Sequence, residues 1–251
     1  PGRLAEPNTI LATLLNVLGV ERDLVGETVL VTAGPTREDI DPVRYLTNRS
    51  SGRMGYAVAE AAARRGARVI LVSGPTALKR PVGVEVTAVR TTEEMRRAVL
   101  ARAHEASIVV GAAAVVDFRP RKPAAQKIRR ARGSWRLDLE PTADILQELG
   151  RKKNHRMLVG FAAEAENVVA NARAKLRAKK LDIVVANDVT QDGAGFDVET
   201  NVVTLITRDG KTIPLPKMAK LAVAHRLLDE TRRLRPSRPA PKLRGGAGSA
   251  S

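Results

Sequence analysis

A loop of unusual length follows the first apolar run of the chain, and it limits the folds that the sequence can adopt. Val29-Leu30-Val31 precedes a segment, 32–55, that reads TAGPTREDIDPVRYLTNRSSGRMG and leads into an Ala-rich amphipathic stretch. This order predicts a strand, a long loop and a helix. In an open α/β sheet such a loop lies at the carboxyl end of a strand, where ligands bind. Loops much longer than about two to six residues tend to be functional or disordered.

The loop is rich in small and polar residues that can approach a phosphate through backbone N–H groups and hydroxyls. Its last glycines open the following helix, whose N-terminus favours anions. The segment therefore predicts a site for a phosphorylated ligand. Its candidate residues are Gly34, Thr36, Asn48, Ser50, Ser51 and Gly52.

Short β-rich runs alternate with helical patterns along the rest of the chain, which indicates βαβ units and a parallel sheet. The last two β-rich runs, joined around Asp209-Gly210, predict an antiparallel hairpin. The predicted fold is therefore α/β, a Rossmann-like, mostly parallel sheet flanked by helices. The predicted strands are 29–32, 68–73, 84–89, 107–110, 158–161, 181–186, 201–206 and 211–215. The predicted helices are 52–65, 91–104, 143–151, 167–180 and 217–234.

The alternation breaks at 117–136, which carries two prolines, a glycine and a basic cluster. We predict a mobile basic flap there. Several unusual polar residues directly follow predicted strands, which places them along one rim of the sheet, as an α/β enzyme requires. These residues are Asp117, Glu164, Asn187 and Asp188.

The formal net charge of +16 first suggests nucleic acid as a partner. Aromatic residues make up only 2% of the chain, however, which leaves little surface for stacking single-stranded bases. Much of the charge also sits in the flap and beyond Thr231. No run approaches the roughly 18 apolar residues of a membrane span, and cysteine is absent. We therefore expect no nucleic-acid partner, no membrane partner and a cytoplasmic protein.

Three common classes of site fit the sequence poorly. The dinucleotide fingerprint G-x-G-x-x-G is missing after the first strand, and no Walker-type phosphate loop is present. No zinc-like spacing joins His104, His155 and His225. An oxidoreductase of related topology, or a module that binds nucleotides or nucleic acid without catalysis, stays open as an alternative.

An enzyme that uses a nucleoside triphosphate fits better. The flap carries enough cations to neutralise the roughly four negative charges of a triphosphate. A solvated basic loop is the simpler explanation of such a run when it stands alone. Beside a donor-rich corner between strand and helix, a phosphate-binding role is favoured. The flap cations are Arg119, Arg121, Lys122, Lys127, Arg129 and Arg130.

Five motifs in order resemble those of bacterial phosphopantothenoylcysteine synthetase over roughly 28–234. The first and longest is GPTRE, DPVR and NRSSGRMG within 34–55. The others are AAAVVD at 112–117, KI at 127–128, GFAAE at 160–164, and LD with AND within 181–188. This chain departs from the family pattern at Val116, where alanine is usual, at Arg129-Arg130, where a lysine pair is usual, and at Ala143, where proline is common.

The resemblance implies a CTP-dependent ligase of coenzyme A biosynthesis. The carboxylate of 4′-phosphopantothenate would attack the α-phosphate of CTP to give an acyl-cytidylate and pyrophosphate. The amine of L-cysteine would then displace CMP. Such chemistry needs charge neutralisation and positioning rather than a covalent enzyme nucleophile.

The resemblance also assigns roles to residues. Asn48 would orient the intermediate and donate to its acyl oxygen, although it could instead cap a helix or hold a turn. Lys127 would contact the triphosphate, unless it is only a surface lysine. Asp117 would accept from ribose or base, with a buried structural carboxylate as the rival interpretation. Ala114 would join the loop around the phosphates and the intermediate. The positions expected to bind CTP are Gly111, Ala112, Ala113, Asp117, Lys127, Ala143, Asp144, Ile145, Leu146, Phe161, Lys175 and Lys179.

The resemblance further implies a homodimer whose active sites use parts of both subunits, with a higher oligomer for a longer protein. Mg²⁺ is expected with CTP, although no carboxylate cluster identifies protein ligands for it. Residues 1–26 resemble the end of an upstream decarboxylase and a linker, and that upstream domain would use FMN. We expect 27–235 to form the synthetase domain and the Pro/Gly/Ser-rich 236–251 to be a disordered tail.

Overall fold

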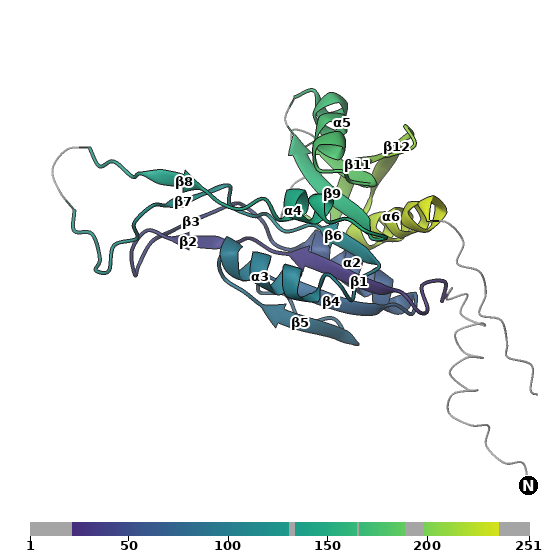
Figure 1. Cartoon of the computed structure of the whole chain (residues 1–251), viewed down its shortest axis with the longest axis horizontal. Helices are drawn as coiled ribbons and strands as arrows, with labels where there is room; N and C mark the ends of the chain where they lie inside the picture. Colours follow the sequence, from purple (N-terminus) through teal and green to yellow (C-terminus); the bar gives the residue numbers. More distant parts are fainter. Residues whose placement is uncertain (1–21, 131–133, 165, 189–197, 236–251) are drawn as a thin grey trace, which may run out of the picture.

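The computed structural model describes residues 22–130, 134–164, 166–188 and 198–235. The predicted remnant of an upstream domain lies almost wholly outside these residues, and so does the predicted disordered tail. The described part contains the α/β fold expected from the sequence (Figure 1).

One eight-stranded sheet organises the described part, in the order β12-β11-β10-β9-β6-β1-β4-β5. The strands from β5 to β10 in this order are parallel, whereas β11 pairs antiparallel with both β10 and β12. The predicted parallel sheet and C-terminal hairpin are thus confirmed. The strand bounds are β1 Thr28–Ala33, β4 Arg68–Ser73, β5 Val84–Ala88, β6 Ile108–Gly111, β9 Met157–Glu164, β10 Ile183–Asp188, β11 Thr200–Thr207 and β12 Thr212–Ala219.

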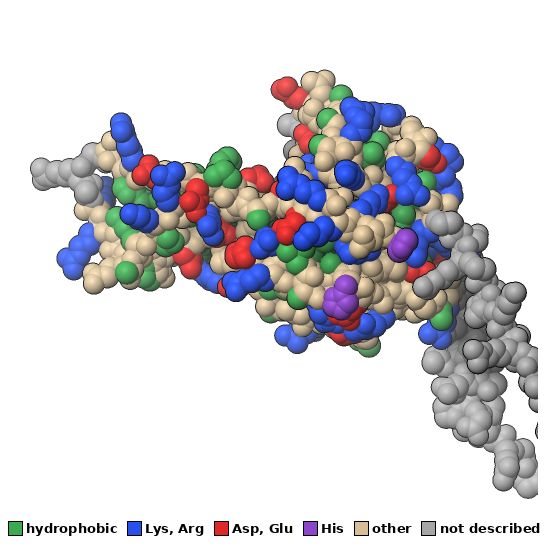
Figure 2. Space-filling model, in the orientation of Figure 1, with side chains coloured by type: hydrophobic (Ala, Val, Ile, Leu, Met, Phe, Trp, Pro, Cys, Tyr) green, Lys and Arg blue, Asp and Glu red, His purple; other side chains and the backbone are tan. Residues whose placement is uncertain are grey.

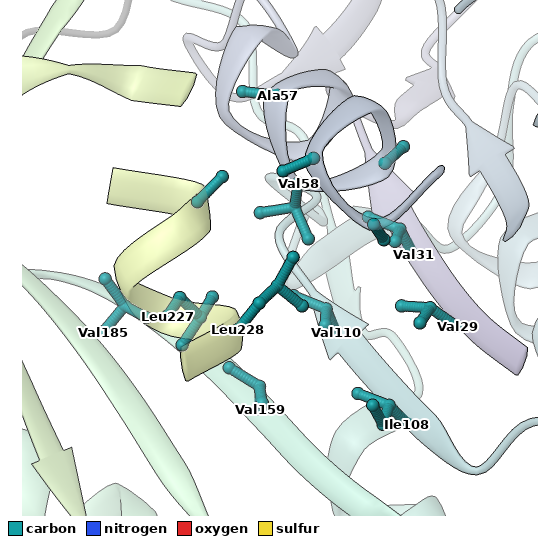
Figure 3. Close-up of a cluster of buried hydrophobic side chains, with 14 of the residues drawn as sticks. Val29, Val31, Ala57, Val58, Ile108, Val110, Val159, Val185, Leu227 and Leu228 are labelled. Atoms are coloured by element: carbon teal, nitrogen blue, oxygen red, sulfur yellow. The ribbon is translucent and has the colours of Figure 1, made fainter. Parts of the chain in front are cut away.

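Helices cover both faces of the sheet because neighbouring residues of each strand point to opposite sides. Val29 and Val31 of β1 pack under α2 and α6, in the cluster drawn in Figure 3. Leu30 between them packs on the other side with α3, α4 and α5. The helix bounds are α2 Arg53–Arg64, α3 Thr92–Arg102, α4 Ile145–Arg151, α5 Val168–Ala178 and α6 Lys220–Leu234.

The ends of α2 and α3 follow from local sequence. Thr91 and Glu94 form a capping box at the start of α3, in which the Thr91 hydroxyl accepts from the Glu94 N–H at 3.1 Å. Gly52, at φ 79°, is the N-cap of α2 in a left-handed conformation that glycine adopts without strain. The predicted helix at 217–234 begins later than expected, because residues up to Ala219 belong to β12.

An arm projects from the sheet, on the left of Figure 1. It consists of two antiparallel pairs: β2 (Arg37–Asp39) with β3 (Tyr45–Thr47), and β7 (Phe118–Pro120) with β8 (Leu139–Pro141). The Ala124 N–H donates to the Ile40 carbonyl at 2.9 Å and joins the two pairs. The long loop and the predicted flap are therefore partners in one extension. The short strands β2 and β3 lie inside the segment that the sequence predicts as a loop, because three-residue strands leave no periodic signal.

Positive charge is dispersed rather than gathered in one patch on the face that Figure 2 shows, where Lys and Arg alternate with Asp and Glu. Arg68, for example, pairs with both Glu85 and Glu105. None of the helices in the described ranges combines the length and the apolar character needed to cross a membrane.

Candidate active site

A cavity of about 520 Å³ opens at the carboxyl ends of β1, β6 and β9. The chain leaves β1 toward β4 on one side, while β6 lies on the other side, so the cavity sits where the strand order reverses. Open α/β sheets bind ligands at this point. Thr32 at the end of β1, Gly111 at the end of β6 and Phe161 of β9 all line it.

The structure brings most of the predicted site residues to this one cavity, although they come from five separate parts of the chain. The cavity-lining residues among them are Asn48, Ser50, Ser51, Gly52, Gly111, Ala112, Ala113, Ala114, Asp117, Ala143, Asp144, Ile145, Leu146, Phe161, Lys175 and Lys179. Asn187 also lines it. Asp117 is exposed, so the interpretation as a buried structural carboxylate is wrong.

Asn48 joins the long loop to the segment after β6. Its side-chain amide donates to the Val115 carbonyl at 2.8 Å, across 67 positions of the chain. The residue itself is exposed on the cavity wall. The amide therefore ties the long loop to the segment after β6 and lies on the cavity wall at once, so this structural contact and the predicted functional role of Asn48 do not exclude one another.

The N-terminus of α2 forms the adjoining wall. Its N-cap Gly52 supplies no side-chain cap, and no acidic residue lies in the first turn. Gly55 lets the helix lie close to β1: a Cβ at this position would stand 2.5 Å from Ala33 Cβ. The open N–H groups of the first turn and the helix dipole together favour an anion here.

Lys175 of α5 and Lys179, the C-cap residue of that helix, supply positive charge at another part of the cavity lining. Lys179 pairs with Asp144 at 2.7 Å, and Asp144 also caps α4 by accepting from the Gln147 N–H at 2.9 Å. Burial, and then the charge of Lys179, lower the pKa of Lys175. A partly desolvated ammonium group gains more from an anionic ligand than an exposed one does.

Two predicted residues of the long loop lie away from the cavity lining. Thr36 is fully buried, and its hydroxyl accepts from the Val116 N–H at 2.9 Å and contacts the Thr92 hydroxyl at 3.1 Å. Its predicted contact with a phosphate is therefore wrong in this structure, because its hydroxyl is used internally. Gly34, at φ 74°, packs against Gly74 and Thr76 and serves the turn after β1.

Lys127 also lies outside the cavity lining, on the exposed arm. The neighbouring backbone of Ile128 is fixed by Asp41 and Arg44. Asp41 Oδ2 accepts from the Ile128 N–H at 3.1 Å, and Arg44 Nη2 donates to the Ile128 carbonyl at 2.7 Å. Arg44 also donates to Asp41 through Nε at 3.0 Å. This Asp41–Arg44 clamp holds the stretch that carries Lys127 at a defined place on the arm.

The sequence motifs do not point to two further cavity residues, Asn201 and Lys220, from β11 and the start of α6. Both are buried. Lys220 Nζ donates to the Val198 carbonyl. No local pattern distinguishes them from ordinary strand and helix residues, because only the folded hairpin brings them to the site.

Comparison with known proteins decides the family. Residues 24–234 match the family described as the DNA/pantothenate metabolism flavoprotein C-terminal domain. This chain belongs to that family. The resemblance expected from the motifs is thereby confirmed.

Curated proteins that are similar to this chain carry the name coenzyme A biosynthesis bifunctional protein CoaBC. The chain is 48% identical over 232 residues to the coenzyme A biosynthesis bifunctional protein CoaBC of Bacillus subtilis, covering 91% of this chain and 57% of that protein. It therefore spans little more than half the length of the curated relatives that it matches.

Two solved structures share the fold of this chain. The C-terminal domain of a CoaBC protein superposes with a TM-score of 0.72 at 43% identity, covering 84% of this chain and 96% of that one. A Cab2 mutant in complex with phosphopantothenate-cysteine superposes with a TM-score of 0.67 over 92% of this chain and 94% of that one. At 16% identity this second likeness concerns the fold alone.

Proposed function

We propose that this chain is a phosphopantothenate–cysteine ligase of coenzyme A biosynthesis that uses CTP. The observation that supports this proposal most directly is the cavity at the point where the strand order reverses. It is lined by Asn48, by the open N-terminus of α2, and by Lys175 and Lys179. The names of the CoaBC relatives support the pathway. The Cab2 complex shows that a protein of this fold holds phosphopantothenate-cysteine.

In the first half-reaction a carboxylate oxygen of 4′-phosphopantothenate attacks the α-phosphorus of CTP, and pyrophosphate leaves with the electrons of the broken P–O bond. Charge accumulates on the phosphate oxygens. The first turn of α2 offers N–H donors to them, and Lys175 offers an ammonium group. Enzymatic phosphoryl and nucleotidyl transfers depend on this kind of positioning and charge stabilisation.

In the second half-reaction the amine of L-cysteine attacks the acyl carbon, a C–N bond forms and CMP leaves. The acyl oxygen becomes negative in the tetrahedral state. Asn48 is suited to donate to it, because its amide lies on the cavity wall and its position is fixed by the bond to Val115.

The cytidine end would bind at the opposite side of the cavity, among Gly111, Ala112 and Ala113. Leu146 fills the space beside Gly111: a Cβ there would stand 2.8 Å from Leu146 Cδ1. The small side chains of Ala112 and Ala113 leave the backbone after β6 open to a flat base, with Asp117 and Lys179 at the polar rim.

Lys127 fits this function if the active site is shared between two subunits. Within one chain it is exposed and lies outside the cavity lining. We therefore place Lys127 of one protomer at the triphosphate of its partner, in a homodimer. An arm that projects from the sheet has the reach that such exchange needs.

Mg²⁺ would enter with CTP. In the ranges that the structure describes, no group of three or more His, Asp or Glu side chains converges to hold a metal ion. These residues therefore form no cage of protein ligands for Mg²⁺, and the phosphates of CTP would supply most of the ligands of the ion.

Pyrophosphate release tests the proposal. With CTP, phosphopantothenate and cysteine present, the chain should release pyrophosphate and form the amide, and CTP should be preferred over ATP, GTP and UTP. Nucleotide binding without release would favour a binding module. A change in nicotinamide absorbance in place of release would favour an oxidoreductase.

A further inference from the structure

A second groove adjoins the candidate active site on the other side of the long loop. It has a volume of about 630 Å³ and lies between the loop after β1 and the segment after β4. Asn48, Ser50, Ser51 and Arg53 line both this groove and the first cavity. The two spaces therefore share one wall, and Asn48 is part of it.

The side chains that line the groove include cations and no acid. Arg37 and Arg53 are the charged residues among them. Arg53 is paired with Glu199. Arg37 forms no ion pair with a carboxylate in the part of the chain that the structure describes. A guanidinium group without a carboxylate partner, on a groove without acids, attracts a small anion.

The environment of Arg37 indicates that its side chain is held in place. Its guanidinium carbon lies 4.6 Å from the centre of the Tyr45 ring, and its backbone N–H donates to the Arg90 carbonyl at 2.8 Å. Its Nε is buried and has no hydrogen-bond partner. That N–H costs free energy as it stands, and the part of the Arg37 side chain that lines the groove is the part that an anion can reach.

We propose that this groove binds the α-carboxylate of the amino-acid substrate, cysteine, through Arg37. The proposal rests on the proposed function. An α-amino acid brings both a carboxylate and the attacking amine, separated by a single carbon. With its carboxylate on Arg37, the amine points along the groove toward the shared wall at Asn48. Nitrogen then attacks the acyl carbon, CMP leaves with the bonding electrons, and the amine gives up its proton to water.

Cysteamine provides the test, because it keeps the amine and thiol of cysteine and lacks the carboxylate. On the unmodified chain, cysteine should have a KM about tenfold or more below that of cysteamine, on the scale of a hydrogen bond to a charged group. Equal KM values for the two amines would overturn the proposal without any substitution being needed.

Substitution of Arg37 tests whether this residue causes the lower KM for cysteine. Arg37→Gln should raise the KM for cysteine about tenfold or more and leave the KM for cysteamine near its starting value. Arg37→Lys, which keeps the charge and loses the fork of donors, should recover part of the difference. The matched control is Arg90→Gln, since Arg90 also lies over Tyr45, at 5.7 Å, but does not line the groove.

The first half-reaction, which needs no cysteine, distinguishes binding of the cysteine carboxylate by Arg37 from binding of a phosphate group by Arg37. Without cysteine, CTP and phosphopantothenate should give one burst of pyrophosphate in Arg37→Gln as in the unmodified chain. A lost burst, or a raised KM for CTP or phosphopantothenate, would assign Arg37 to a phosphate and overturn the proposal. An unmodified chain that releases no pyrophosphate would instead refute the proposed function. Thermal unfolding of each variant identifies any loss of fold.

Discussion

Asp41 and Ile128 are joined by a hydrogen bond of 3.1 Å across 87 positions of the chain, from the Ile128 N–H to Asp41 Oδ2. The same oxygen accepts from Arg44 Nε and Nη2, and Oδ1 accepts from the N–H groups of Val43 and Arg44. Arg44, foremost, holds the pKa of Asp41 well below its usual range. One carboxylate thus organises the turn before β3 and attaches the basic stretch to it.

Asp41→Asn should release that stretch. The new amide can keep one oxygen for Val43 and Arg44, but its NH₂ group then faces the donors of Arg44 and Ile128. We expect a lower Tm and faster proteolytic cleavage between Arg121 and Arg136. Arg119→Gln, which loses only an exposed pair with Glu140, is the control. Cleavage at an unchanged rate in Asp41→Asn would contradict the clamp.

Asn48→Asp should stop the reaction after the acyl-cytidylate. The new carboxylate cannot donate to the acyl oxygen and repels its developing charge, so amide formation should fall by about 10²-fold or more. The burst of pyrophosphate should remain. Quenched-flow detection of the intermediate with CTP and phosphopantothenate measures the burst, and addition of cysteine to the same mixture measures amide formation. Amide formation at the normal rate would remove Asn48 from its assigned role.

Lys127→Gln should reduce turnover of CTP by about 10²-fold, on the scale of losing an electrostatic donor. The activity of mixtures of two inactive variants shows whether Lys127 acts in its own chain or in the partner subunit. Equal amounts of Asn48→Asp and Lys127→Gln chains, re-associated at random as symmetric dimers, should recover about a quarter of full activity if the groups come from different subunits. Recovery of none would show that they act in one chain or not together.

Gly55→Ala should destabilise the fold although alanine favours helices. Its Cβ would stand 2.5 Å from Ala33 Cβ and 3.0 Å from the Thr32 carbonyl oxygen, so α2 must move away from β1. We expect a loss of about 1–3 kcal/mol from overpacking, measured by urea unfolding. Glu60→Ala, on the more exposed side of the same helix, should change stability by about 0.5 kcal/mol at most. A more stable Gly55→Ala chain would show that α2 is free to shift.

Glu105 gives the stability of the fold a pH dependence. Arg102, and then Arg68, lower its pKa from the ordinary 4.5 to about 2. Since the folded pKa is the lower one, its contribution is fully present above pH 4.5 and is lost as the pH falls toward about 2. The Tm difference between the unmodified chain and Glu105→Gln should therefore shrink through this window. A Tm difference that stays constant down to pH 2 would contradict the lowered pKa of Glu105 as the cause.

Much of the fold follows from the order of residues alone. The alternation of apolar runs and helical patterns specifies the sheet, since a strand covered on both faces must be apolar throughout, as Val29-Leu30-Val31 is. The capping box at Thr91 and Glu94 and the hairpin turn at Asp209-Gly210 are local signals, and the structure contains both. Local rules suffice where neighbouring residues decide the conformation.

The composition of the site could also be predicted in large part. Parallel strands end at one edge of a sheet, so residues that follow them meet there, and Asn48 and Asp117 do line one cavity. Lys175, on α5, lines the same cavity, but only the family resemblance predicted it. What each of them contacts could not be predicted. The bond from Asn48 to Val115 and the burial of Thr36 join segments about 70 to 80 positions apart, at distances that no local pattern specifies.

The sequence by itself determined the layered α/β sheet and the rim at which its polar residues collect, because burial and strand periodicity act residue by residue. The tertiary structure alone decided that the long loop and the basic segment form one arm, that Lys127 lies outside the cavity that Asn48 lines, and that Arg37 lines a second groove. The physical reason is that these relations depend on which distant segments satisfy each other's backbone and charged groups. These contacts between distant segments form only when the whole chain folds.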